Sequence, residues 1–222
     1  MNISNIPQII SIEGNIGSGK STLVAKLSEE LKEHEDICFL QEPVELWNSI
    51  KDERGITIIE KFYAETEKHA FEFQLMAYIS RLSILKNAVK CGRYKYIITE
   101  RCVHTDANVF ERMLYDDKKI TQTQHIIYRR WFDEFISDFP ITKVIYVKTD
   151  PETAFHRVIQ RNRLGEHIPL EYLKRCSKYH DNWIHLFDVK KLIINANVDI
   201  GHYPYIMNEW TNVIKEFIFK NN

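Results

Sequence analysis

Neither sign of charge is in excess in this sequence of 222 residues, which has 30 Lys and Arg, 31 Asp and Glu, and a formal net charge of -1 at pH 7. The lack of a basic excess argues against DNA or RNA as a partner, and 44% hydrophobic with 27% charged residues is typical of a globular protein. No apolar run approaches the ~18 residues of a membrane span, and the first residues show no signal-peptide or transit-peptide pattern. We therefore expect a cytoplasmic protein whose partners include neither a nucleic-acid polymer nor a membrane.

Cysteine, glycine and proline are also scarce. The four cysteines, Cys38, Cys91, Cys102 and Cys176, are widely spaced and form no C-x-x-C pair, so we expect reduced thiols and no disulfide framework or structural zinc. No Pro/Gly/Ser-rich linker, repeat or low-complexity stretch divides the chain. One domain over residues 1–222 is predicted, long enough to bury roughly 70% of its unfolded surface.

Five short apolar runs rich in β-branched residues recur between longer helical patterns, at residues 8–13, 37–42, 96–100, 143–147 and 191–195. Nearly continuous apolar strands separated by helices predict an α/β fold, a five-stranded parallel sheet with helices on both faces. Ligands of such sheets bind beyond the carboxyl ends of the strands. The segments that follow the five runs are therefore where a site is expected.

The first of these segments lies within residues 12–22, IEGNIGSGKST, which contain the phosphate-loop pattern G-x-x-x-x-G-K-[ST] between a strand and a helix. Its glycines let backbone amides point at phosphate, Lys20 can reach the β- and γ-phosphates, and the Ser21 hydroxyl can bind Mg2+. The predicted nucleotide-binding residues are Gly14, Asn15, Ile16, Gly17, Ser18, Gly19, Lys20, Ser21 and Thr22. A loop that binds nucleotide without turnover is the alternative.

A second donor element begins at Pro151, which suits the first position of a helix, with Asp150 as its cap. Arg157 and Arg161 lie four residues apart on one face of this helix, and Arg163 follows in a predicted loop. Clustered guanidinium groups can close over a transferring phosphoryl group and stabilise its charge. A solvated basic face is the alternative for these three arginines.

Carboxylates and an amide follow the next strands and mark an acceptor half. Glu42 follows the second strand, where a carboxylate can take the proton of an attacking hydroxyl. Gln74, Ala77 and Arg81 share one helical face, and a Gln amide can donate and accept together, as a nucleobase edge requires.

The third strand ends in YIITERCVHTD. Glu100 can hold Mg2+ or its waters, Arg101 can clamp phosphate, and Asp106 follows six residues after Glu100. Placed together at one sheet edge, these groups and the phosphate loop predict phosphoryl transfer to a small molecule.

In order and spacing the motifs resemble the deoxynucleoside kinase family from about residue 9 to residue 200. They are EGNIGSGKST, EPVELW, FEFQ with an Arg seven residues after its Gln, ERC with a following Asp, RNR and IPLEYL. The resemblance implies a P-loop kinase fold with a short arginine-bearing lid at about residues 161–169. It implies phosphorylation of a deoxynucleoside 5'-hydroxyl with ATP and Mg2+, and a homodimer for which the helical segments 71–90 and 121–135 are candidate packing surfaces.

The same resemblance implies roles for individual residues. Glu42 would be the general base with Arg101 beside it, and Gln74 would bind the base between the apolar walls Trp47 and Phe110. Tyr63 and Glu166 would hold the sugar 3'-hydroxyl, Arg161 and Arg163 would be the lid arginines, and residues 197–200, with Asp199, would lie near the donor adenine. Two departures are a Cys at position 102 where the family has Ser, and a lid one residue short between Glu166 and Pro169.

Arg81 and Asp106 bear on which base is accepted. Such a charged pair resembles the deoxycytidine, deoxyadenosine and deoxyguanosine branch, and it would occupy the space that a thymine methyl needs. Deoxycytidine or purine deoxynucleosides are therefore favoured, because a base that leaves buried polar groups unpaired is strongly rejected. An ordinary ion pair between two elements is the alternative reading of Arg81 and Asp106.

Three other functions stay open at this point. A broad or thymidine-preferring deoxynucleoside kinase would use the same site. A nucleoside monophosphate kinase of the thymidylate kinase type shares the loop, but Glu42 would repel the phosphate of its acceptor. A catalytically inactive nucleotide-binding regulatory protein would bind ATP and convert no deoxynucleoside.

Overall fold

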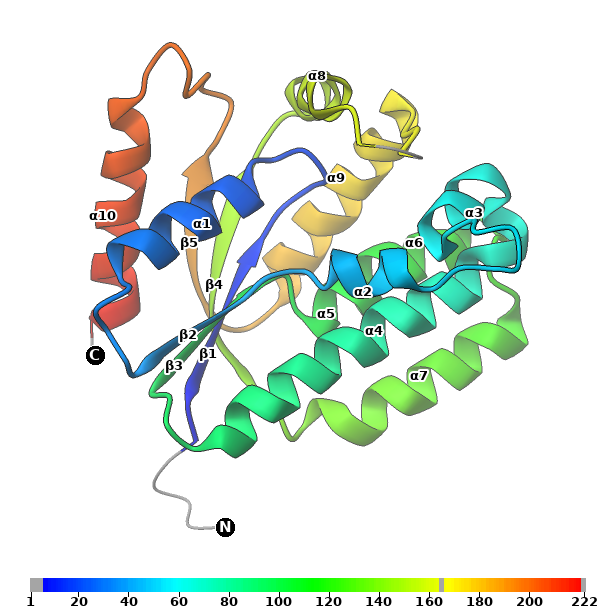
Figure 1. The fold of residues 1–222 in the computed structure, drawn as a ribbon, viewed down its shortest axis with the longest axis horizontal. Helices are drawn as coiled ribbons and strands as arrows, with labels where there is room; N and C mark the ends of the chain where they lie inside the picture. Colours follow the sequence, from blue (N-terminus) through cyan, green and yellow to red (C-terminus); the bar gives the residue numbers. More distant parts are fainter. Residues whose placement is uncertain (1–5, 164–165, 221–222) are drawn as a thin grey trace.

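The computed structural model describes residues 6–163 and 166–220, and its centre is a five-stranded sheet (Figure 1). The strands are ordered β2-β3-β1-β4-β5 and every neighbouring pair is parallel, which confirms the predicted α/β fold. Their bounds are β1 (Gln8–Glu13), β2 (Ile37–Leu40), β3 (Tyr96–Glu100), β4 (Ile141–Lys148) and β5 (Lys190–Asn195).

The bounds of three predicted strands differ from the structure, and of these β5 differs only in beginning one residue earlier, at Lys190. Strand β2 ends at Leu40 and not at residue 42, because it pairs only with β3 and its last partner there is Thr99. Pro43 follows three residues after Leu40 and disfavours a further ladder. Strand β4 is longer than predicted, since its first residues pair with the start of β1 around Ile9.

Helices cover both faces of the sheet, as predicted (Figure 1). Helices α1 (Lys20–Glu30) and α10 (Tyr205–Phe219) pack on one face. The other face carries α4 (Thr66–Cys91), α5 (Val103–Thr105), the π-helix η2 (Asp106–Glu111), α6 (Arg112–Asp116), α7 (Gln122–Ile136) and α9 (Leu170–Leu186). Around the carboxyl ends of the strands lie α2 (Val44–Ser49), α3 (Ile58–Ala64) and α8 (Pro151–Arg161).

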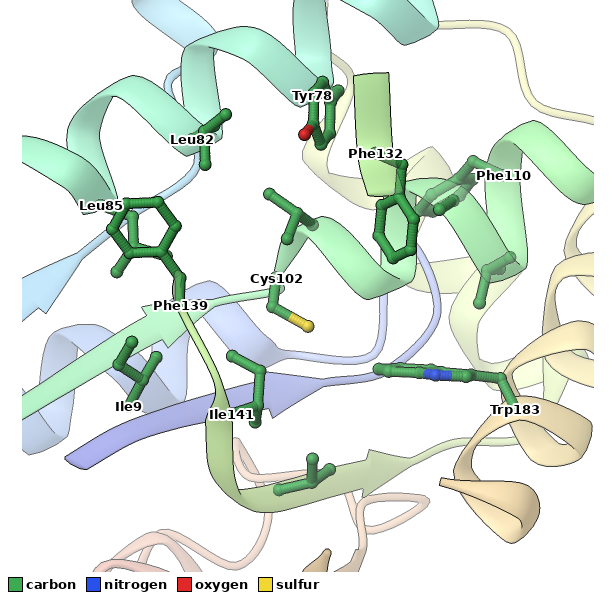
Figure 2. Packing of buried hydrophobic residues seen from close by; sticks show 14 of the residues in the cluster. Ile9, Tyr78, Leu82, Leu85, Cys102, Phe110, Phe132, Phe139, Ile141 and Trp183 are labelled. Carbon is green, nitrogen blue, oxygen red and sulfur yellow. The ribbon is translucent and has the colours of Figure 1, made fainter. Parts of the chain in front are cut away.

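Alternation along β1 explains this two-sided packing. Ile10 and Ile12 point into the cluster under α1 and α10, whereas Ile9 points into the cluster beneath α4 and α9. Figure 2 shows the second cluster, where Cys102 and Trp183 pack among aromatic side chains. Burial of both faces of the central strand places the site at its end, where no side chains are needed for the core.

Several smaller predictions can be compared with the structure. Pro151 is the first residue of α8 and Asp150 is its N-cap residue, as predicted, although the Asp150 side chain forms no cap hydrogen bond. Of the predicted lid at 161–169, Leu164 and Gly165 lie outside the described residues. All four cysteines are free thiols. Across the described ranges, none of the helices combines the length and the apolar character that crossing a bilayer requires.

Candidate active site

A cleft of about 460 Å³ lies at the carboxyl ends of the strands and is lined by most of the predicted site residues. Of the predicted site residues, only Gly14 and Asn15 are absent from its lining. The predicted residues that line it are Ile16, Gly17, Ser18, Gly19, Lys20, Ser21, Thr22, Glu42, Trp47, Tyr63, Gln74, Ala77, Arg81, Glu100, Arg101, Asp106, Phe110, Arg157, Arg161, Arg163, Glu166 and Asp199. Donor and acceptor halves thus share one space.

The phosphate loop between β1 and α1 depends on two of its glycines. Gly14 has φ +148°, and a Cβ there would lie 2.5 Å from the carbonyl oxygen of Val147. Gly17 has φ +78°, and its Cβ would overlap the carbonyl oxygen of Ala154 in α8. Both positions therefore require glycine for conformation and for the close approach of neighbouring backbone.

The buried Lys20 ammonium donates to the carbonyl oxygen of Asn15 at 2.6 Å, within the loop itself. Burial, followed by the positive charge of Arg101, lowers the pKa of Lys20 to about 7. The Asn15 amide donates to the carbonyl oxygen of Leu173 in α9 at 2.8 Å. The Asn15 side chain therefore ties the loop to α9, which explains its absence from the cleft.

Two oxygen ligands lie together at the start of α1. The Ser21 hydroxyl donates to the Glu100 carboxylate at 2.5 Å, although 79 residues separate them in the sequence. Glu100 is buried at the end of β3, next to the phosphate loop on β1. A hydroxyl and a carboxylate at this spacing are the hard oxygen ligands that Mg2+ prefers.

Glu42 is held by two guanidinium groups on the acceptor side. Its Oε1 accepts from Arg101 Nη1 at 2.5 Å and from Arg81 Nη2 at 3.1 Å. Burial raises the pKa of Glu42, but the charges of Arg101 and then Arg81 outweigh burial and lower it to about 2. Glu42 is therefore ionised at neutral pH and fixed in position.

Arg101 also binds the phosphate loop. Its Nη2 donates to the Gly14 carbonyl oxygen at 3.3 Å, and its guanidinium lies 5.0 Å from the centre of the Phe110 ring. Arg101 has φ +60°, a left-handed conformation that is uncommon for a residue other than glycine. Such strain persists only where the surroundings fix the backbone, and it clusters at functional sites.

Arg81 joins Glu42 to Asp106 inside the cleft. Its Nε donates to Asp106 Oδ2 at 2.9 Å, and its Nη1 donates to the Glu100 carbonyl oxygen at 2.7 Å. Burial raises the pKa of Asp106, and the Arg81 charge opposes this effect. Gln74, Ala77 and Arg81 are all buried, so the predicted shared helical face points into the cleft.

The amide of Gln74 is 3% exposed, and its Oε1 has no hydrogen-bond partner among the described residues. Such an acceptor is costly to bury without a partner. Trp47 nearby is satisfied, since its indole N–H donates to Ser80 Oγ at 2.9 Å and its ring meets Phe73 edge to face. The result is an apolar slot with an unpaired acceptor in its wall.

The lid residues are arranged differently from the separate roles implied by the resemblance. Arg161 donates to both carboxylate oxygens of Glu166, at 2.9 Å from Nε and 2.5 Å from Nη2. The predicted phosphate ligand and the predicted sugar ligand thus bind each other. Burial, then the neighbouring Glu166 charge, raises the pKa of Tyr63, so its phenol keeps its proton as a hydrogen-bond donor.

The donor end of the cleft is closed by Arg157 and the loop after β5. Arg157 donates to the carbonyl oxygen of Ser18 at 3.4 Å and to that of Val198 at 3.0 Å. It therefore links the phosphate loop to the segment that contains Asp199. The Asp199 carboxylate accepts from the Gly201 amide and contacts His202, both at 2.8 Å.

Sequence reasoning missed part of the lining. These residues are Val44, Ile59, Phe62, Phe73, Gln160, Tyr172, Met207 and Trp210. Tyr172 lies inside the IPLEYL motif and could have been found there. The apolar ones follow helical spacing and look like core residues, so no local signal distinguishes them.

Comparison with known proteins agrees with this geometry. The family model described as deoxynucleoside kinase matches residues 10–218. Human deoxycytidine kinase is 33% identical over 241 residues, which cover 94% of this chain and 90% of that protein. Probable deoxycytidine kinase of Fowlpox virus (strain NVSL) is 34% identical over 86% of this chain and 79% of that protein. The mitochondrial deoxyguanosine kinase of Xenopus laevis is 25% identical over 94% of this chain and 89% of that protein.

The match to the family spans nearly all of the sheet and its covering helices. It includes the phosphate loop, Glu42 and Arg101, whose side chains meet in one cleft. The chain therefore belongs to the deoxynucleoside kinase family of transferases.

Proposed function

We propose that the protein transfers the γ-phosphoryl group of ATP to the 5'-hydroxyl of a deoxynucleoside, with Mg2+, and that deoxycytidine or purine deoxynucleosides are preferred. The observation that carries this proposal is the fixed Glu42 carboxylate between Arg101 and Arg81, in the same cleft as the phosphate loop. A carboxylate for the acceptor hydroxyl and cations for the phosphoryl group are the parts that this reaction needs.

Glu42 would accept the proton of the 5'-hydroxyl as the oxygen bonds to phosphorus and the bond to the donor β-phosphate oxygen breaks. Its low pKa favours the ionised form that this step requires. Arg101 lies between Glu42 and the phosphate loop, so its guanidinium can stabilise charge on the transferring group. Arg161 and Arg163 line the same cleft and can join it there.

The donor side supports ATP with Mg2+. The backbone amides of the phosphate loop and Lys20 would bind the triphosphate. Ser21 and Glu100 would hold Mg2+, whose charge neutralises the phosphate oxygens when bound. The adenine would lie beside Arg157 and the segment around Asp199, which both line the cleft.

The base preference rests on Gln74, Arg81 and Asp106. Gln74 Oε1 lacks a partner among the described residues and can accept from an amino group of the base. The Arg81–Asp106 pair is buried and lines the cleft, which supports the proposal that its charged groups would occupy the space that a thymine methyl needs. Opening of the Arg161–Glu166 pair would free Glu166 for the sugar 3'-hydroxyl, beside Tyr63.

The proposal is tested by steady-state turnover of Glu42→Gln with deoxycytidine, deoxyadenosine, deoxyguanosine and thymidine, and with the monophosphates of deoxycytidine and thymidine. We expect kcat on deoxycytidine to fall by about 10² to 10⁴-fold. Glu45→Gln is the matched control, because Glu45 lies exposed three residues away, in α2.

Three results would contradict the proposal. Wild-type kcat in Glu42→Gln removes the base assignment, and preference for a monophosphate indicates the thymidylate kinase type of reaction. Binding of ATP without turnover of any deoxynucleoside indicates the regulatory alternative.

A homodimer is also proposed, through α4 and α7. Four large apolar side chains on these helices are exposed, Ile79 at 41%, Ile126 at 52%, Ile127 at 42% and Trp131 at 47%. Helices α4 and α7 lie side by side, since Tyr78 donates to the Trp131 carbonyl oxygen at 3.0 Å. A second copy would cover this surface through the same residues, as a two-fold interface does.

Sedimentation velocity at micromolar concentration should show a dimer for the wild type and a monomer for Ile127→Glu. Leu186→Glu on α9, at a site 78% exposed, is the control and should sediment as the wild type does. A wild-type monomer would remove the claim.

A further inference from the structure

Glu13 is a buried carboxylate that has no role in the proposed reaction. It is the last residue of the central strand β1 and is 0% exposed. Among the described residues it forms no ion pair, and its oxygens accept instead from two hydroxyls, Ser11 Oγ and, at 2.6 Å, Thr105 Oγ1. Burial raises the pKa of Glu13, against the effect of these hydrogen bonds.

Glu13 lies between the two residues whose backbone carbonyl oxygens accept hydrogen bonds from Arg101. The Arg101 amide donates to the Ile12 carbonyl oxygen at 3.0 Å, and its guanidinium donates to the Gly14 carbonyl oxygen at 3.3 Å. The carbonyl groups on either side of Glu13 therefore accept hydrogen bonds from the backbone amide and from the side chain of Arg101. A change at Glu13 would act on both contacts.

Thr105 connects Glu13 to the turn at residues 102–105, which directly follows Arg101 and is called the Arg101 turn below. The Thr105 amide donates to the Cys102 carbonyl oxygen at 2.9 Å, while the Cys102 amide lies 3.4 Å from Thr105 Oγ1. Thr105 thus closes the tight turn at residues 102–105, and its hydroxyl donates to Glu13 from across 92 residues of sequence. Cys102 itself packs in the hydrophobic cluster and adds a second anchor (Figure 2).

Stability alone is a poor reason for this arrangement. Replacing a buried polar group and its partners by apolar groups of similar shape is often neutral or stabilising. The left-handed backbone at Arg101 gives the arrangement a different use, because a strained conformation persists only where neighbouring contacts fix it.

We propose that Glu13 is a positioning residue, which holds the Arg101 turn against the phosphate loop through Thr105 and so sets the Arg101 guanidinium at Glu42. The inference rests on the proposed function, in which Arg101 stabilises the transferring phosphoryl group. A displacement of about 1 Å at such a group can cost on the order of 100-fold in rate, so one lost hydrogen bond can have a large catalytic effect.

The experiment compares Thr105→Val, Thr105→Ser and Thr99→Val in a MgATP and deoxycytidine assay. Thr105→Val keeps the side-chain shape and removes the hydroxyl, so kcat should fall about 10 to 100-fold while both KM values stay within about threefold. Thr105→Ser should restore kcat. Thr99→Val is the matched control, since Thr99 is also buried, two residues from Arg101, and its hydroxyl has no partner in the described part of the chain.

Glu13→Leu keeps a similar side-chain volume, removes both acceptor oxygens and serves if Thr105→Val does not fold, with the same expected loss of kcat. Crystal structures of the variants give a second readout that needs no activity. Displacement of the Arg101 guanidinium from Glu42 in Thr105→Val or Glu13→Leu, but not in Thr99→Val, supports the inference.

Failure of the inference and failure of the proposed function differ in outcome. Active wild type with unchanged kcat in Thr105→Val and Glu13→Leu overturns the positioning role and leaves the kinase proposal in place. Inactive wild type overturns the kinase proposal, and the position of Arg101 in the variant structures then decides whether Glu13 holds the turn. An unmoved Arg101 in both variants overturns the inference.

Discussion

Acid should remove a defined part of the stability that Glu42 contributes. In the folded protein its pKa is lowered from the ordinary value of 4.5 to about 2, because the charges of Arg101 and Arg81 outweigh the effect of burial. A carboxyl whose folded pKa is depressed stabilises the protein above its unfolded pKa, and that stability is lost as pH falls through the folded pKa. For Glu42 the loss begins near pH 4.5 and is complete below about pH 2.

The size of the effect follows from the two pKa values. Their difference corresponds to about 3 kcal/mol over the whole range. The side chain is 16% exposed, so solvent screening reduces this figure only moderately. Between about pH 6 and about pH 3.5 the loss should be about 1.4 kcal/mol, because by then the unfolded carboxyl is largely protonated and the folded one is not.

Urea unfolding of the wild type and of Glu42→Gln at these two pH values isolates the contribution of this carboxyl. Other titrating groups affect both proteins, so the difference between their unfolding free energies reports Glu42. That difference should shrink by about 1.4 kcal/mol on acidification, whereas Glu45→Gln should follow the wild type. A difference that does not change with pH would refute the reasoning, since it would mean that Glu42 titrates alike in the folded and unfolded protein.

Two further predictions concern the two halves of the cleft. Gly17→Ala should raise the Kd for ATP by at least about 10-fold in calorimetry, because its Cβ would meet the Ala154 carbonyl oxygen at φ +78°. Gly55→Ala, at φ +80° with open space around it, should leave the Kd unchanged, and equal effects would contradict the steric argument. Asp106→Asn should lower the ratio of kcat/KM for deoxycytidine to that for thymidine by at least about 10-fold, since it removes the charge paired with Arg81. An unchanged ratio in a panel assay would leave the buried pair a purely structural role.

The strands and the phosphate loop could be predicted from the sequence because their signals are local. A buried parallel strand is nearly all apolar, and β1 and β3 match the predicted bounds to the residue. The ends of β2 and β4 depend on where their neighbours stop pairing, which no local pattern records. Pairing length is a property of the sheet and not of one strand.

Within the candidate site, residue types were easier to predict than partners. Gln74 and Arg81 stood out because polar groups interrupt an otherwise apolar helical face. Phe73 and Trp210 did not, since an apolar side chain in a cleft wall has the same spacing as one in the core. The Arg161–Glu166 pair was also missed, because each residue has a plausible ligand of its own and sequence cannot rank a protein partner against a bound one.

The low pKa of Glu42 bears directly on how the proposed reaction would proceed. A general base is most effective with a pKa near the working pH, and a carboxylate with a pKa of about 2 is a weak base. Phosphoryl transfer in most analyses passes through a loose transition state, in which the acceptor hydroxyl has gained little bonding and little acidity. A strong base is then not required, and the loss of kcat expected in Glu42→Gln would come mainly from losing the carboxylate that positions the acceptor hydroxyl.

Arg101 links the low pKa of Glu42 to the phosphate loop, because the guanidinium that lowers this pKa also donates to the Gly14 carbonyl oxygen in the loop. In the proposed reaction the same charge would therefore be available to the transferring phosphoryl group, whose equatorial oxygens share the negative charge of the transition state. Once the 5'-oxygen bonds to phosphorus its proton becomes strongly acidic, and even a weak carboxylate can then accept it. Under the proposed function, Arg101 would therefore lower the basicity of Glu42, which a loose transition state needs little, and would supply a fixed positive charge, which that transition state does need.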